Sequence, residues 1–220
     1  MTTKAFLIAG IVLATAIPAA AQNRPSFDCT KARDDVEKAI CRSAELSNLD
    51  REIALVFGQL RRQLDSEAAR ALRQEQETFN ASREVALSSR DTSLQEFMTG
   101  HLTLLRRIQI PATTTGAAAF LGEWGSPSGK VSIKPGKDGL FSVEINTAAM
   151  ISARWVCEAS GEARMRDGRL SFKEDDVEII LSRKGQSLAI EEILPADHGR
   201  GYCGANGAVE GQYFKLRPGE

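Results

Sequence analysis

The chain has 220 residues, with 28 Lys and Arg against 29 Asp and Glu, so its formal net charge is −1 at pH 7. Residues 22–110 contain 14 basic and 14 acidic residues, and residues 111–220 contain 13 and 15, which excludes the electrostatic footprint of a nucleic-acid-binding protein. The length is sufficient for one large domain or two small ones.

The first residues are typical of a secretory signal peptide. Lys4 precedes an uncharged apolar run from Ala5 to Ile17, and small residues follow up to Ala21. The apolar run is too short for a membrane-spanning helix, which needs about 20 residues. The sequence therefore predicts a signal peptide at residues 1–21, cleavage near Ala21, no stable membrane anchor, and a periplasmic or secreted mature protein.

Residues 22–109 have the apolar spacing of a small helical bundle. Apolar side chains recur every three or four positions in a short segment at 34–42 and in three longer segments after it. We expect Ser43, Asp65 or Ser66, and Asp91 to act as helix N-caps. His101 lies on or beside the apolar stripe of the last helix, where a structural histidine is more common than a ligand or a base.

Several short motifs in this segment occur together in a known family. They are Phe27-Asp28-Cys29, Val36-Glu37-Lys38-Ala39-Ile40-Cys41, Glu45-Leu46, Leu49-Asp50-Arg51-Glu52 and the run from Glu75 to Arg83, in which Phe79 stands where the family pattern has a tryptophan. With these residues the chain resembles the N-terminal domain of the LprI-type lysozyme-inhibitor family, over residues 26–108. The resemblance implies a helical module of an exported, non-enzymatic protein that binds a lysozyme or another cell-wall hydrolase.

The composition changes after residue 109. Residues 110–119 include an uncharged stretch without large side chains or periodicity, which is typical of a linker. From 120 to 220, short runs alternate with period two between Gly and Asp-Gly turns, and about eight strands fit this pattern. The predicted fold class is α+β with segregated parts: a disulfide-linked helical bundle, then an antiparallel β-barrel or curled sandwich.

The four cysteines divide between these two parts. An even number in an exported chain favours disulfides, and we expect the pairs Cys29 with Cys41 and Cys157 with Cys203. A zinc site is disfavoured because there is no C-x-x-C motif and the two histidines are far apart in the sequence.

Known catalytic motifs are missing from the sequence, which contains no H-E-x-x-H, G-x-S-x-G or G-x-G-x-x-G pattern. If all four cysteines are bridged, no thiol nucleophile remains. We therefore expect no enzyme activity, no catalytic residue, no metal and no cofactor.

Two loops contain candidate binding residues. A hydrolase inhibitor can present hydroxyls and a cation to two catalytic carboxylates, and Ser126, Ser128 and Lys130 provide both. His198 and Arg200, in a glycine-rich loop, are the second choice. The acidic run at 174–178, continued at 191–192, is either a solvated turn or a patch that steers a basic partner such as a lysozyme.

Two alternative functions stay open. Gly122-Glu123-Trp124 is similar to the G-x-W start of lipocalin-like barrels, in which the tryptophan closes one end, so the second domain is also a candidate for binding a small molecule or a lipid. The other alternative is an envelope scaffold or accessory protein.

Overall fold

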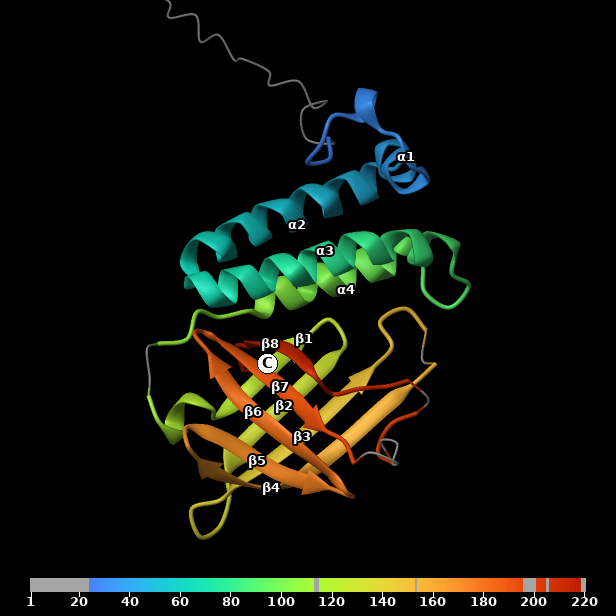
Figure 1. The fold of residues 1–220 in the computed structure, drawn as a ribbon. Helices are drawn as coiled ribbons and strands as arrows, with labels where there is room; N and C mark the ends of the chain where they lie inside the picture. The colour runs from blue at the N-terminus through green and yellow to red at the C-terminus, as the bar shows by residue number, and fades with distance from the viewer. Residues whose placement is uncertain (1–23, 113–114, 153, 196–200, 205, 219–220) are drawn as a thin grey trace, which may run out of the picture.

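The computed structural model describes residues 24–112, 115–152, 154–195, 201–204 and 206–218. The predicted signal peptide lies outside these residues. Four helices come first in the chain, and a closed barrel of eight antiparallel strands follows them (Figure 1). The predicted fold class is therefore confirmed.

Each α-helix begins at a side-chain cap. The helices are α1 (Asp35–Arg42), α2 (Ala44–Gln63), α3 (Ser66–Ser88) and α4 (Leu94–Arg107), and a short 3₁₀ helix, η2 (Cys29–Lys31), precedes them. Ser43 caps α2 and Asp65 caps α3, as predicted, because each side chain accepts a backbone N–H from the first turn. The prediction for Asp91 is wrong. Ser93 caps α4, because Glu96 three residues later completes a capping box with it.

The helices stack in layers above the barrel, with α1 and α2 farther from the strands and α3 and α4 nearer to them (Figure 1). Their apolar stripes meet in one buried cluster that includes Leu72, Phe79 and Met98. The same cluster contains Phe214 and Leu216 from the barrel side. The helical core is therefore completed by residues from the C-terminal part of the chain.

The barrel is an up-and-down meander in which each strand pairs with the next one in sequence. Its strands are β1 (Gly122–Ser126), β2 (Gly129–Pro135), β3 (Phe141–Ala148), β4 (Val156–Arg166), β5 (Arg169–Glu174), β6 (Val177–Lys184), β7 (Ser187–Ile193) and β8 (Gly211–Lys215). Pairing of β1 with β8 closes the sheet, so both of these strands have a partner on each side. The predicted Asp-Gly turn at 167–168 has the positive φ angles that a tight hairpin turn requires.

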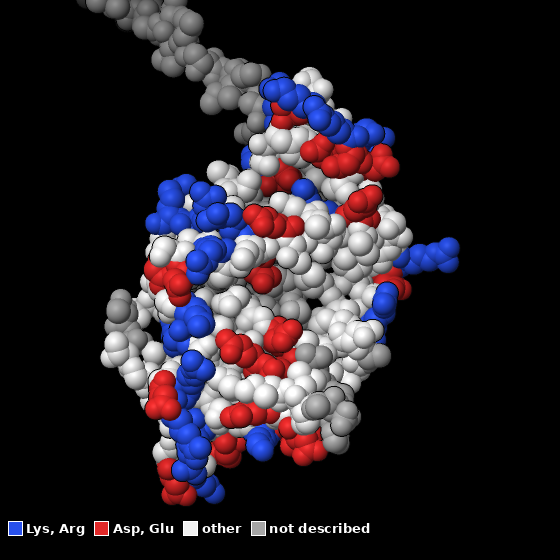
Figure 2. Space-filling view, in the orientation of Figure 1, with Lys and Arg blue, Asp and Glu red and all other residues white. Residues whose placement is uncertain are grey.

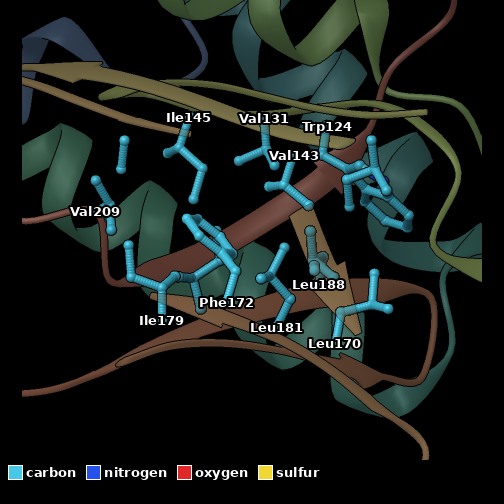
Figure 3. Close-up of a cluster of buried hydrophobic side chains, with 14 of the residues drawn as sticks. Trp124, Val131, Val143, Ile145, Leu170, Phe172, Ile179, Leu181, Leu188 and Val209 are labelled. Atoms are coloured by element: carbon cyan, nitrogen blue, oxygen red, sulfur yellow. The ribbon is translucent and has the colours of Figure 1, made fainter. Parts of the chain in front are cut away.

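Side chains from the strands fill the barrel interior. Inward residues such as Val143, Ile179 and Leu181 point toward one another in one buried cluster (Figure 3). Strand β4 contributes small residues, and a Cβ added to Gly161 would lie 2.5 Å from the Phe172 ring. Phe172 therefore occupies the space that a side chain at position 161 would need.

Trp124 lies fully buried where one end of the barrel is covered by a short 3₁₀ helix, η3 (Ala117–Ala119). Its Nε1 donates a hydrogen bond of 2.7 Å to the carbonyl of Phe120, the residue after that helix. The guanidinium of Arg183 and the ammonium of Lys215 lie 4.6 Å and 4.8 Å from the indole ring, within cation–π range. Both cations also donate to backbone carbonyls of the covering segment. The tryptophan and the two cations thus form a plug at this end.

Both predicted disulfides are present. Cys29–Cys41 joins η2 to α1, and Cys157–Cys203 joins β4 to the segment before β8. Two disulfides indicate an oxidising location outside the cytoplasm. None of the helices in the described part of the chain combines the length and the apolar composition that crossing a bilayer requires.

Candidate functional site

Backbone pairing holds the helices against the barrel. The chain leaving α4 runs beside the end of β8, where the N–H of Gln109 donates to the carbonyl of Lys215 at 2.9 Å. A second contact is reciprocal: the backbone N–H of Asp65 donates to the Gln186 side chain at 2.8 Å, and the N–H of Gln186 donates to the Asp65 carboxylate at 2.6 Å. A Cβ on Gly185 would lie 2.3 Å from that carboxylate, so the turn requires glycine here.

A cleft of about 360 Å³ lies between α4 and the hairpin of β1 and β2. We call it the α4–hairpin cleft. Its polar lining comes from both sides: Glu96, His101, Thr103 and Arg107 on α4, Thr92 just before α4, and Ser126, Ser128 and Lys130 on the hairpin. Phe79, Phe97, Leu104, Met150 and Leu216 form its apolar lining.

The structure brings three of the predicted site residues together at this cleft. Ser126 ends β1 and Ser128 lies in the tight turn after it; their hydroxyl oxygens are 3.2 Å apart, and both residues are half-buried. Lys130 is exposed at the edge. The turn therefore lies against α4 and does not project as a free loop. The second pair of predicted residues, His198 and Arg200, lies outside the described residues.

His101 lines the cleft with only 7% of its surface exposed. Its ring stacks on Phe79 at a centroid distance of 3.7 Å, and its Nε2 lies 3.0 Å from the Oε1 of Gln76. Burial, with a smaller contribution from the charge of Arg83, lowers the pKa of His101 to about 4, so the ring is neutral at pH 7. Among the described residues, its buried Nδ1 has no hydrogen-bond partner.

A buried carboxylate connects the motif residues of the helical part. The Asp50 carboxylate accepts hydrogen bonds from the backbone N–H and the hydroxyl of Ser26, at 2.7 and 2.6 Å. It also pairs with the Arg83 guanidinium at 3.3 Å, and Arg83 lies over the ring of Phe79. Asp50, Phe79 and Arg83, which the sequence motifs single out, therefore form one connected network between the N-terminal segment, α2 and α3.

Glu75 lies on the same side of α3 as the buried residues Leu72 and Phe79, and it has no hydrogen-bond or ion-pair partner among the described residues. Burial raises the pKa of its carboxyl to about 7. This folded-state pKa lies above the ordinary value of 4.5. The contribution of Glu75 to stability is thus fully present below about pH 4.5 and is lost as the pH rises through 7.

Replacing Glu75 by glutamine tests this pH dependence. At pH 8 the free energy of unfolding of the variant should exceed that of the parent by about 1–3 kcal/mol. The reason is that the parent must hold an ionised, largely buried carboxylate at this pH, whereas the glutamine is neutral. At pH 4 the two proteins should unfold at the same denaturant concentration. His101 acts in the opposite sense, since its lowered pKa removes stability as the pH falls from about 6.5 toward 4. Urea unfolding curves at several pH values provide the measurement, and a gain that is equal at pH 4 and pH 8 would contradict the prediction.

The two predicted acidic segments meet on the outer wall of the barrel. Asp175 and Asp176 form the exposed turn between β5 and β6. Along β6 and β7, Glu178 pairs with Ile193 and Ile180 pairs with Glu191. Ile193 is 54% exposed, which is unusual for a large apolar side chain on a barrel wall.

We call these four residues, Glu178, Ile180, Glu191 and Ile193, the β6–β7 patch. Figure 2 shows acidic side chains gathered at the centre of the visible barrel face, with Lys and Arg along its left border. Glu192, the last residue of the acidic segments, instead points inward and accepts a hydrogen bond from Tyr202. The acidic run is thus both a solvated turn and part of a wider acidic surface.

Comparison with protein-family models, with curated proteins and with solved structures found no match for this chain. Within the described residues, no group of three or more His, Cys, Asp and Glu side chains is arranged to hold a metal ion.

Proposed function

We propose that this is a non-enzymatic protein that binds a lysozyme or another cell-wall hydrolase outside the cytoplasm. The resemblance of residues 26–108 to lysozyme inhibitors motivates the proposal. The single structural observation that carries it is the β6–β7 patch, which presents carboxylates around an exposed isoleucine on a rigid wall.

The chemistry of this patch suits a basic partner. Unpaired surface carboxylates attract a basic protein over about a Debye length and raise its association rate. Neither Glu178 nor Glu191 forms an ion pair among the described residues, so both charges are available to a partner. Ile180 and Ile193 add apolar area between the charges, which a partner can bury on contact.

Inhibition is tested directly with the mature protein in excess over c-type, g-type and i-type lysozymes, by following lysis of a cell-wall substrate. We expect at least one of the three enzymes to be slowed in proportion to the amount of complex formed. Full activity of all three enzymes at saturating protein would contradict the proposal.

Neutralising the patch should act on the association rate. With Glu178→Gln and Glu191→Gln together, we expect association with the inhibited enzyme to slow by about three- to tenfold at low salt and the salt dependence to weaken, because steering charges are lost. The matched control carries Glu77→Gln and Glu84→Gln, two exposed carboxylates on α3. Surface plasmon resonance at several salt concentrations measures both. Equal slowing by the control variant would mean that net charge matters and the patch does not.

A further inference from the structure

We propose that the α4–hairpin cleft is a binding site for a small sugar acid. The inference does not rest on the proposed hydrolase binding, because the cleft and the β6–β7 patch are formed by different elements. Three observations carry it: the open volume beside Gly100, two cations without carboxylate partners among the described residues, and the buried Nδ1 of His101, which has no hydrogen-bond partner there.

The volume of the cleft is suited to a small ligand. At about 360 Å³, it lies near the lower end of the range for ligand sites, about 300–1,000 Å³. Gly100 opens its α4 side, since a Cβ there would have no atom within 4 Å. On the opposite wall the equivalent space is filled, because a Cβ on Gly125 would lie 2.7 Å from Leu216.

Two cations border one end of the cleft. Lys130 lies opposite Gly125 in the β1–β2 register. A Cβ on Gly125 would lie 3.2 Å from Leu104 of α4, so this part of the hairpin lies directly against the helix. Arg107 follows Leu104 by one helical turn and also lines the cleft. Neither Lys130 nor Arg107 forms an ion pair among the described residues. Two such cations beside apolar walls favour a ligand with a carboxylate.

The one carboxylate of the cleft does not compensate these cations. The Oε2 of Glu96 accepts the backbone N–H and the hydroxyl of Ser93, each at 2.8 Å, in the capping box of α4. Those hydrogen bonds lower the pKa of Glu96, which is therefore ionised and engaged at the other end of the helix. The charge that remains open to a ligand is positive.

Hydroxyl and imidazole groups occupy the middle of the cleft. When Nε2 of the neutral His101 donates to Gln76, its buried Nδ1 keeps a lone pair that can accept a hydrogen bond from a ligand hydroxyl. Ser126 and Ser128 hydrogen-bond to each other, which leaves one hydroxyl donor and several lone pairs for the other ligand hydroxyls. Phe97 and Leu104 offer an apolar wall for the C–H face of a sugar ring. A carboxylate together with several hydroxyls on a compact ring satisfies all of these groups.

The test is isothermal titration calorimetry of the whole mature protein with N-acetylmuramic acid and with glucuronic acid. N-acetylglucosamine and glucose are the matched neutral sugars, because each lacks the carboxylate of its acidic counterpart. We expect saturable binding of at least one acid, weakening as salt is added, and at least tenfold weaker binding of its neutral counterpart. Binding of neither acid, or equal binding of acid and neutral sugar, would overturn the proposal.

Two variants locate the binding in the cleft. Gly100→Leu places a large side chain in the open volume and should abolish binding, whereas Gly58→Leu makes the same change on α2, where only the flexible Arg62 side chain is near. Lys130→Ala should weaken acid binding by about tenfold, and Lys134→Ala, four residues along the same strand, should leave it unchanged. Thermal unfolding checks that each variant is folded. Undiminished binding by a folded Gly100→Leu variant would place the ligand elsewhere and overturn the assignment.

Discussion

Replacing Asp50 by alanine should lower the free energy of unfolding by about 3–5 kcal/mol. Asp50 is only 7% exposed, and its carboxylate forms an ion pair with the guanidinium of Arg83. The Arg83 side chain is 17% exposed. Without the carboxylate, a largely buried positive charge loses its counter-ion, and the N–H and hydroxyl of Ser26 lose their acceptor. Urea unfolding followed by circular dichroism measures the loss.

Glu52 provides the matched control for Asp50, because it lies on the same helix and also pairs with an arginine. Its partner is Arg106, and the two side chains are 40% and 58% exposed. Glu52→Ala should therefore cost less than about 1 kcal/mol, as surface ion pairs usually do. If the two alanine variants lost the same stability, burial of the Asp50–Arg83 pair would not be what makes it important.

Removing the Cys157–Cys203 disulfide, by replacing both cysteines with alanine, should cost about 4 kcal/mol in the chain-entropy account of a cross-link. The bond spans 46 residues, so its loss frees a long loop in the unfolded chain. The Cys29–Cys41 bond spans only 12 residues and should cost about 3 kcal/mol when it is removed in the same way. Denaturant unfolding of the two double variants, compared with the oxidised parent, checks both values. A loss below about 1 kcal/mol for Cys157–Cys203 would contradict the expectation.

Local patterns were sufficient to predict the helices and many of the strands. The helix caps at Ser43 and Asp65 depend on short-range hydrogen bonds to the following turn, which the sequence shows directly. The prediction for Asp91 failed because Ser93 is also a capping residue and Glu96 makes its cap reciprocal. Strand β4 shows the alternation only weakly, because its inward residues Ala159, Gly161 and Ala163 do not form a run of large apolar side chains.

The candidate site could be predicted only in part. Ser126, Ser128 and Lys130 were recognised by their chemistry, as a cation near two hydroxyls. Their position against α4, and the unpartnered Nδ1 of His101 on that helix, follow from how β1 and β2 lie across a helix that precedes them in the chain. The residue pattern of α4 alone, or of the β1–β2 hairpin alone, does not predict that contact.

The sequence by itself determined the elements of this protein: helices from the 3.6-residue apolar spacing, strands from the alternation of inward and outward residues, and disulfide partners from the separation of the cysteines into two segments. Only the tertiary structure decided which surfaces meet. Closing the barrel between β1 and β8 brought Phe214 and Leu216 into the buried cluster of the helices. The physical reason is that the pattern of one strand or helix fixes which side is apolar, whereas the partner of that side depends on the packing of segments distant in the chain.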